Sequence, residues 1–288
     1  MLRRRLTLTA VPLTIAALVL AGCTATATTT PVAAATEELT ATVASASELG
    51  ADAVLAANAD VTVTGDDEWS AADAVDVALE GSTVTITEAG VFRLSGSLEG
   101  QVVVAAPDDA QVVLILDDAT IEASDAPAIT VTTADDVVIS LEGDNAVSDA
   151  SSYADDAAAD AAIYADADLT ITGSGSLQVT GNGNDGITST DDLVVVSGEI
   201  AVTAVDDGLR GKDALLVSGG TVTVAAGGDA LKSDQDQDAA QGFVWISGGT
   251  LTLTSGDDGV AAATDAVITG GAVSITAGGS ATATDDSP

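Results

Sequence analysis

The chain is predicted to fold as an all-β solenoid, a parallel β-helix, because one short phrase recurs in it at a fixed period. In each copy an Asp is followed by Gly or Ala and then by an aliphatic residue, and the first three copies are spaced by 22 residues. The fourth copy follows 29 residues after the third, and the polar insert 234–241 explains the longer interval. The Asp residues that mark the four copies are Asp185, Asp207, Asp229 and Asp258.

Short apolar segments lie between the copies, and each ends in a glycine turn. They occupy residues 193–198, 215–220, 244–249 and 266–271. Short strands bounded by glycine are typical of a coil in which one turn is one repeat of about 22 residues. A helical alternative fails because few windows without a Gly or Asp turn exceed about ten residues.

At the N-terminus, residues 1–22 are predicted to be a lipoprotein signal peptide. Three arginines at positions 3–5 precede the apolar run 11–20, which is too short for a secure membrane span. The run ends in Leu20-Ala21-Gly22-Cys23, which resembles a bacterial lipobox, where the Cys becomes the lipid-modified first residue. Cys23 is the single cysteine of the sequence, so we expect a lipid anchor there and no intrachain disulfide.

Residues 23–60 are rich in Ala, Thr and Ser and show no strand alternation, which predicts a flexible tether with a weak helical turn around 48–57. The β-helix domain is expected to span 61–288. It opens on an acidic cluster at 66–68 and on Trp69, which we expect to cap the open end of the coil.

From Thr83 onward, short β-branched segments separated by Gly, Asp or Pro predict the first turns of the coil. A polar insert at 143–160 is expected to interrupt them. The predicted strands before the repeat lie at 83–87, 91–94, 101–104, 111–116, 129–131, 137–141 and 169–172.

The composition limits the possible ligands. The sequence has 45 acidic residues, seven basic residues and no His, and removal of the signal peptide leaves only four bases. Such a charge usually indicates disorder, but 47% of the residues are apolar and they are periodic, which argues against disorder in the repeat. The charge excludes electrostatic binding to nucleic acid or an anionic membrane, and it favours cations, neutral ligands or anions bridged by a cation.

In a parallel β-helix, equivalent residues of successive turns stack at roughly 4.8 Å. The alignment therefore predicts inward aliphatic ladders, because these positions alternate with Thr, Ala and Ser along each strand. The first inward ladder is Ile187, Leu209, Leu231 and Val260. The others are Ile200/Val202, Val222/Val224, Leu251/Leu253 and Val273/Ile275.

Three outward ladders follow from the same alignment. The first is acidic and is formed by the four Asp residues of the repeat. The second is basic, because Arg210 and Lys232 are equivalent and Lys212 lies nearby. The third is apolar and consists of Val194, Leu216, Trp245 and Val267.

The acidic ladder predicts a calcium site. Carboxylates at this spacing repel by roughly 3–4 kcal/mol per pair at an effective dielectric near 20, and by less where solvent screens them. Ca²⁺ suits several carboxylates in loops, whereas the lack of His and the use of Cys23 disfavour transition metals. Asp-Gly turn chemistry explains a single Asp equally well. The candidate metal ligands are Asp185, Asp206, Asp207, Asp213, Asp229, Asp234, Asp236, Asp257 and Asp258.

The bases and the tryptophan of the repeat are candidate sugar-binding residues. Arg210, Lys212 and Lys232 either balance the acidic corner or hold a sugar carboxylate with bridging Ca²⁺. Trp245 either packs against the insert 234–241 or stacks on a sugar ring. A Lys or Arg beside Ca²⁺ could also act as the base in β-elimination from a uronate, so we keep a lyase as an alternative.

Three successive stretches, 207–213, 218–224 and 228–234, resemble the secreted carbohydrate-binding β-helix family, and residues 91–98 and 111–118 are similar to its N-terminal turns. The likeness covers about 68–280. It implies a right-handed single-stranded parallel β-helix with bound Ca²⁺, pectate-lyase-like in shape, that binds cellulose and acidic sugars such as polygalacturonate. This sequence departs from the family pattern at Thr188, Ala230 and Ala261, so its charged corner is only two turns tall.

Together these features predict a monomeric lipoprotein at the extracellular face of a bacterial membrane that binds polysaccharide with calcium and does not bind nucleic acid. Two alternatives remain at this point. One is a calcium-dependent polysaccharide lyase, and the other is a structural or adhesive surface solenoid without a sugar ligand.

Overall fold

The computed structural model describes residues 69–154 and 157–278, all of which fall in the compact unit Glu48–Pro288. The other unit, Met1–Ser47, lies outside the described residues. The expected signal peptide 1–22, the lipid site Cys23 and the tether 23–60 therefore lie outside them as well. Within the described part, no helix has both the length and the apolar character that are needed to cross a membrane.

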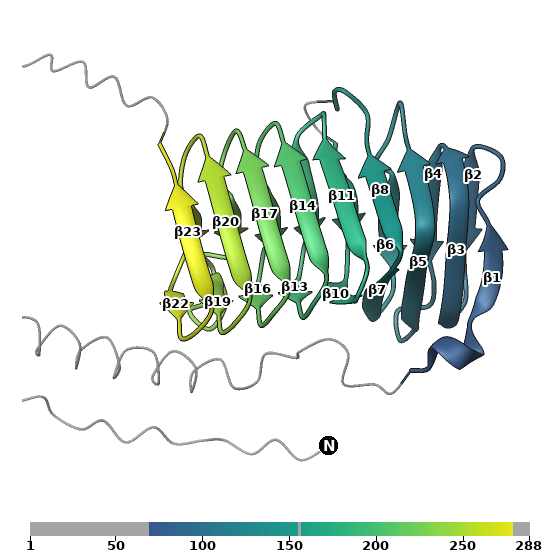
Figure 1. Ribbon diagram of the computed structural model, residues 1–288, viewed down its shortest axis with the longest axis horizontal. Coiled ribbons are helices and arrows are strands. Elements are labelled where there is room, and N and C mark those ends of the chain that lie inside the picture. The colour runs from purple at the N-terminus through teal and green to yellow at the C-terminus, as the bar shows by residue number, and fades with distance from the viewer. Residues whose placement is uncertain (1–68, 155–156, 279–288) are drawn as a thin grey trace, which may run out of the picture. The chain divides into compact units, whose positions relative to one another are not determined.

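The described chain is built from parallel strands arranged in stacked rows (Figure 1). A single 3-10 turn, η1 (Ala71–Asp73), precedes the first strand in this part of the chain. An eight-stranded sheet forms one side of the coil, and we call it the short-strand sheet. Its strands are β2 (Thr83–Ile86), β4 (Gln101–Ala105), β6 (Ile129–Thr133), β9 (Ala161–Ala165), β12 (Asp185–Ser189), β15 (Leu209–Gly211), β18 (Leu231–Ser233) and β21 (Val260–Ala262).

The larger sheet has two rows that meet at the long strands β3 (Gly90–Glu99) and β5 (Gln111–Glu122). Strand β1 (Val75–Ala78) pairs with β3 at the N-terminal end. The first row continues through β7 (Asp136–Glu142), β10 (Asp168–Gly173), β13 (Asp192–Val195), β16 (Ala214–Val217), β19 (Phe243–Ile246) and β22 (Ala266–Ile268). The second row continues through β8 (Asp144–Ser148), β11 (Ser176–Gly181), β14 (Glu199–Ala204), β17 (Thr221–Ala226), β20 (Thr250–Ser255) and β23 (Ala272–Thr276).

The strand registers confirm the expected stacking of equivalent residues. Ile187 pairs with Leu209, Leu209 with Leu231, and Leu231 with Val260. Strands β14, β17 and β20 alternate between exposed and buried residues, so each sends one face inward, as predicted. The inward residues form one continuous aliphatic core. The prediction of an all-β fold with parallel strands is thus confirmed.

Three details differ from the expectations. Residues 144–148 of the expected insert 143–160 form strand β8, which pairs with β5 and β11. Trp69 does not lie over the open end of the coil. It packs on the outward side of the first row, against Val113, Ile115 and Val138. Ile275 was expected to be buried, but its turn is the last described one, and the side chain is 46% exposed.

Candidate functional site

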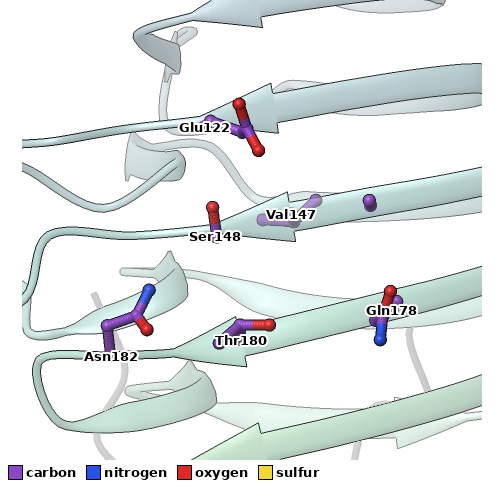
Figure 2. A pocket seen from close by; sticks show the side chains of 7 residues that line it. Glu122, Val147, Ser148, Gln178, Thr180 and Asn182 are labelled. Atoms are coloured by element: carbon purple, nitrogen blue, oxygen red, sulfur yellow. The ribbon is translucent and has the colours of Figure 1, made fainter.

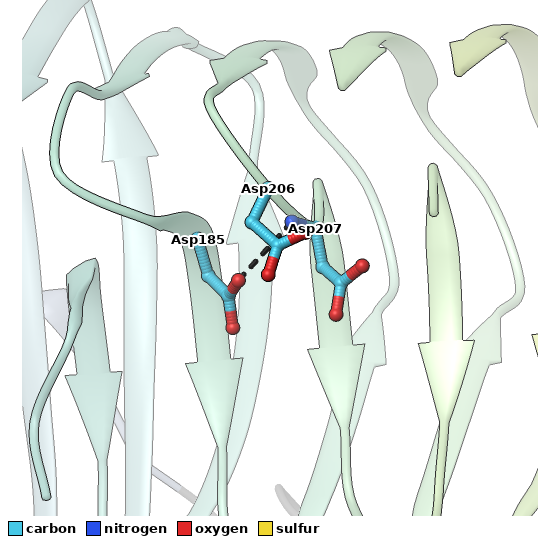
Figure 3. A group of neighbouring side chains, drawn as sticks. All are labelled: Asp185, Asp206 and Asp207. Carbon is cyan, nitrogen blue, oxygen red and sulfur yellow. Dashed lines mark hydrogen bonds between the residues drawn. The ribbon is translucent and has the colours of Figure 1, made fainter. Parts of the chain in front are cut away.

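The Asp residues of the repeat form a hydrogen-bonded ladder beside the strands of the short-strand sheet. In each step, the backbone N–H of the Asp in one turn donates to the Oδ1 atom of the Asp in the turn before it. The donor–acceptor distances are 3.1 Å from Asp207 to Asp185, 2.8 Å from Asp229 to Asp207, and 2.8 Å from Asp258 to Asp229. Figure 3 shows the first step. The repeated Asp therefore has a structural role, because it satisfies a backbone donor of the next turn.

The second carboxylate oxygens of this ladder contact the basic ladder. The Nζ atom of Lys232 lies 2.8 Å from Oδ2 of Asp207 and 3.4 Å from Oδ2 of Asp229. Arg210 lies 3.9 Å from Oδ2 of Asp185, which also accepts a hydrogen bond from the Thr188 hydroxyl at 2.9 Å. Each base thus reaches back to the acid of the preceding turn.

The acidic ladder was expected to point outward, and its first two members are buried by the outward side chains that contact them. Asp185 is 2% exposed and Asp207 is 4% exposed. Burial, followed by repulsion from Asp207, raises the pKa of Asp185 to about 7, although the Thr188 hydroxyl and Arg210 oppose the shift. Buried carboxylates require hydrogen bonds and counter-charges, and the ladder supplies both.

The two paired bases remain protonated at neutral pH. Burial alone lowers the pKa of Lys232, but hydrogen bonding and attraction from Asp207 and Asp229 outweigh it and raise the pKa overall. The pKa of Arg210 is raised in the same way, because the contact with Asp234 outweighs its burial. That contact is a 2.6 Å hydrogen bond.

Three of the predicted metal ligands meet in one place. Asp185, Asp206 and Asp207 each offer a carboxylate oxygen, and these oxygens lie within 4.8 Å of one another (Figure 3). Asp206 is the exposed member. Gly228 leaves room for it, because a Cβ atom at position 228 would lie 2.3 Å from Oδ1 of Asp206.

The other candidate ligands have different contacts. Asp213 accepts hydrogen bonds from the side-chain amides of Gln235 and Gln241 and so holds both ends of the insert 234–241. Asp234 binds Arg210, and Asp236 accepts from Gln237. Asp257 and Asp258 are exposed.

A pocket of about 260 Å³ opens beside the basic ladder on the short-strand sheet. Its outward ladder runs from Tyr164 through Thr188 to Arg210. Lys212 also lines the pocket and forms no ion pair with any residue that the structure describes. The full lining is Ala158, Asp160, Tyr164, Thr188, Ser189, Thr190, Arg210 and Lys212.

Tyr164 was not among the predicted site residues. It belongs to the turn before the recognised repeat, where Ile163 pairs with Ile187. Extending the repeat backward from the inward ladder would have placed Tyr164 in register with Thr188 and Arg210. Because that turn lacks the Asp-Gly phrase, it was not recognised as a copy of the repeat.

The predicted sugar-binding residues do not all come together. Arg210 and Lys212 share the pocket, and Lys232 stacks on Arg210 one turn further along. Trp245 lies on β19 in the other sheet, where its indole N–H donates to the Thr269 hydroxyl at 2.9 Å. It therefore belongs to a different face from the basic residues.

A second hollow of about 320 Å³ lies on the outward face of the second row, across β5, β8 and β11 (Figure 2). Small residues on β8 separate the longer side chains of Glu122 and Gln178, which creates the hollow. Its lining has no base and no aromatic ring, and it consists of Glu122, Ala146, Val147, Ser148, Gln178, Thr180 and Asn182.

A further pair of acids, Asp168 and Asp192, occupies the first positions of the neighbouring strands β10 and β13. The backbone N–H of Asp192 donates to Oδ1 of Asp168 at 3.1 Å, which repeats the ladder contact seen at Asp185. Asp192 is 7% exposed, and burial together with repulsion from Asp168, Asp213 and Asp191 raises its pKa to about 8. Burial is also the main cause that raises the pKa of Asp168, to about 6.

Comparisons with known proteins point to carbohydrate binding. A family model described as "Carbohydrate-binding domain-containing protein" matches residues 80–288. Among solved structures, the chain is similar to the polysaccharide lyase-like protein from C. thermocellum, determined as a gadolinium derivative. The sequence identity is 28% and the TM-score is 0.62, over 72% of this chain and 94% of the other. No curated protein sequence matches the chain.

The raised pKa of Asp192 predicts a pH-dependent stability. Between pH 4 and 8 the folded state holds a proton at this carboxyl that the unfolded state has lost, so stability falls as the pH rises. We expect Asp192→Asn to make this fall shallower in urea unfolding measured across that range. Asp108→Asn, which removes an exposed carboxylate, serves as the control and should leave the slope unchanged. Equal slopes for Asp192→Asn and the parent chain would contradict the assignment.

Proposed function

Because the chain belongs to the family of carbohydrate-binding domain-containing proteins, we propose that it binds a polysaccharide at the pocket formed by Tyr164, Arg210 and Lys212. The observation that carries this proposal is the ammonium of Lys212, which lines the pocket and forms no ion pair with a described residue. The other described bases, Arg93, Arg210 and Lys232, are held by carboxylates, whereas Lys212 is available to a ligand.

The polysaccharide is acidic, with polygalacturonate as the model ligand. Two of the four bases outside the signal peptide face one pocket in a protein of net charge −38, so this is where a sugar carboxylate is least repelled. A planar guanidinium pairs well with a carboxylate. The Tyr164 ring offers an apolar surface to a sugar ring.

The protein acts as a binder rather than as an enzyme. A lyase needs a base that is unprotonated at the working pH. Lys232 and Arg210 do not meet this requirement, because the neighbouring carboxylates raise the pKa of each. The similar C. thermocellum structure is described as polysaccharide lyase-like, which keeps a lyase as the competing function.

Calcium binds at Asp185, Asp206 and Asp207. The site offers only hard oxygen donors at suitable spacing, and the gadolinium in the C. thermocellum structure is a cation of the same oxygen-seeking type. The donor set fits with one restriction, since the Lys232 ammonium already neutralises Asp207. Bound Ca²⁺ would supply a positive charge that can bridge to a sugar carboxylate.

The remaining parts of the proposal concern the whole molecule. The likeness to a polysaccharide lyase-like structure supports a coil of the right-handed single-stranded β-helix type. The sequence Leu20-Ala21-Gly22-Cys23 supports a lipoprotein anchored at the outer face of a bacterial cell membrane. A monomer bound by its lipid would then present the pocket to extracellular polysaccharide.

Removing the Lys212 ammonium should weaken binding to polygalacturonate. A charge-assisted hydrogen bond contributes about 1.5–3 kcal/mol, so we expect Lys212→Ala to lower the affinity by roughly tenfold or more in titration calorimetry. Lys212→Arg, which keeps the charge, should retain most of the affinity. Thr223→Ala, on an exposed position of β17, should have no effect. Unchanged binding by Lys212→Ala would rule out this pocket.

Calcium should raise the melting temperature of the chain relative to a chelator. We expect the difference to disappear in Asp206→Asn and to persist in Asp108→Asn, since only the first removes a ligand. In Lys232→Met the difference should grow, because the competing ammonium is gone. Equal melting temperatures with Ca²⁺ and chelator in the parent chain would reject the site.

Incubation with polygalacturonate and Ca²⁺ should generate no unsaturated product. The measurement is the ultraviolet absorbance of the double bond that β-elimination creates, followed over hours against a blank without protein. A steady increase in absorbance that is lost in Lys232→Ala would show that the protein is a lyase and would contradict the proposal of a binding protein without enzymatic activity.

A further inference from the structure

The hollow on the second row follows from the strand registers. Two outward ladders cross it. Thr120, Ala146, Gln178 and Ala201 form the first, and Glu122, Ser148, Thr180 and Thr203 form the second. On β8 both ladders have small side chains, Ala146 and Ser148, between the longer Glu122 and Gln178 (Figure 2). The resulting volume of about 320 Å³ is large enough for a small ligand.

The polar side chains of the hollow have hydrogen-bonding capacity to spare. In Glu122, Ser148, Gln178 and Thr180 no side-chain atom forms a hydrogen bond with another residue that the structure describes. The pocket beside the basic ladder differs, because most of its polar side chains already hold partners. These side chains are Asp160, Thr188, Ser189, Thr190 and Arg210. The hollow therefore offers more unused polar groups to a ligand.

Asn182 lies at one end of the hollow and is held by a buried carboxylate (Figure 2). Its backbone N–H donates to Oδ1 of Asp149 at 2.6 Å, and its side-chain amide donates to the Asp149 carbonyl oxygen at 3.1 Å. Asp149 is itself 4% exposed and accepts a hydrogen bond from the Tyr153 hydroxyl at 2.6 Å. These contacts orient the Asn182 amide before a ligand arrives, which lowers the entropic cost of binding.

The charge of the lining selects among ligands. Glu122 is the one carboxylate in it, and no base accompanies it, so an anionic sugar is repelled. One carboxylate also falls short of the several charged oxygen ligands that a protein usually provides for Ca²⁺.

An uncharged sugar fits the remaining chemistry. Its hydroxyls both donate and accept, and the lining offers both functions. Glu122 accepts, Gln178 donates and accepts through its amide, and Ser148 and Thr180 do either through their hydroxyls. The Asn182 carbonyl oxygen is a further acceptor.

We propose that this hollow is a second carbohydrate site, for an uncharged polysaccharide, on a different face from the pocket of Tyr164, Arg210 and Lys212. Ala146 leaves the room for a sugar ring, and Glu122, Gln178 and Asn182 bind its hydroxyls. No aromatic ring lines the hollow, so hydrogen bonds rather than stacking provide the recognition. The site goes beyond the proposed function and does not depend on it.

Two sites with different charge preferences let one molecule hold two kinds of chain. The hollow lies on the outward face of the second row, and the pocket lies on the short-strand sheet. The protein then links an acidic polysaccharide to an uncharged one. This consequence, unlike the second site itself, rests on the proposed function.

Titration calorimetry with cellohexaose, xylohexaose and mannohexaose tests the site on the full chain carrying Cys23→Ser, which prevents lipid attachment. We expect at least one hexasaccharide to bind, and Ala146→Leu, which fills the hollow, to lower that affinity by roughly tenfold or more. Ala201→Leu is the matched control and should not change it. It places the same side chain on the same ladder, on β14, outside the lining.

A second variant covers the case in which Ala146→Leu does not fold. Gln178→Ala only removes atoms from an exposed side chain of β11, and it should also weaken hexasaccharide binding, by roughly fivefold or more. Lys212→Ala should keep hexasaccharide binding, and Ala146→Leu should keep polygalacturonate binding, so either site can fail without the other.

Three results would overturn the second site. One is the absence of binding by all three hexasaccharides. Another is equal hexasaccharide affinity in Ala146→Leu and Ala201→Leu. The third is displacement of the bound hexasaccharide by a galacturonate oligomer, because both ligands would then share one pocket.

Discussion

Parallel pairing in fixed register is the constraint on which the rest of this structure depends. It places each residue of one turn directly against its equivalent in the next, so any residue type that recurs is stacked on itself at strand spacing. For Ile187, Leu209 and Leu231 this stacking produces a core without large side chains. For the recurring Asp the same stacking brings negative charges together, and other groups of the chain must offset their repulsion.

The charges of Asp185, Asp207 and Asp229 are balanced through both oxygens of each carboxylate. In Asp185 and Asp207, one oxygen accepts the backbone N–H of the following turn, and the other faces the base that reaches back from that turn. Lys232 serves two acids because the next turn has Ala261 at the equivalent position and supplies no base. The pocket at Tyr164 lies on the same ladder, where the stacked residue changes type from one turn to the next. Variation along a ladder, rather than repetition, thus creates a place for a ligand.

Much of the fold could be predicted from the sequence because a fixed period and β-branched alternation specify parallel stacking directly. The register of Arg210 on Lys232 and the inward ladders are confirmed. Burial of Asp185 could not be predicted, since it depends on Thr188 and Arg210 closing over the carboxylate. Tyr164 and the strand at 144–148 were missed because their turns lack the repeated Asp-Gly phrase. Val194 was expected to be exposed because the alternation of residues along a strand was taken to leave one face in solvent, but its side chain is buried.

The Asp ladder also gives the coil a direction. Asp185, Asp207 and Asp229 each accept a hydrogen bond from the turn that follows in the sequence, so the contacts of one turn are complete only when the next turn has formed. Loss of the turn that contains Asp258 would deprive Asp229 of its backbone donor, whereas loss of a turn at the other end would orphan no carboxylate of the ladder. During synthesis the acidic edge therefore remains unsatisfied at its growing end. A gene that gains or loses repeats has to keep a last turn whose acid needs no donor from a following repeat, and the exposed position of Asp258, which has no such donor among the described residues, meets that requirement.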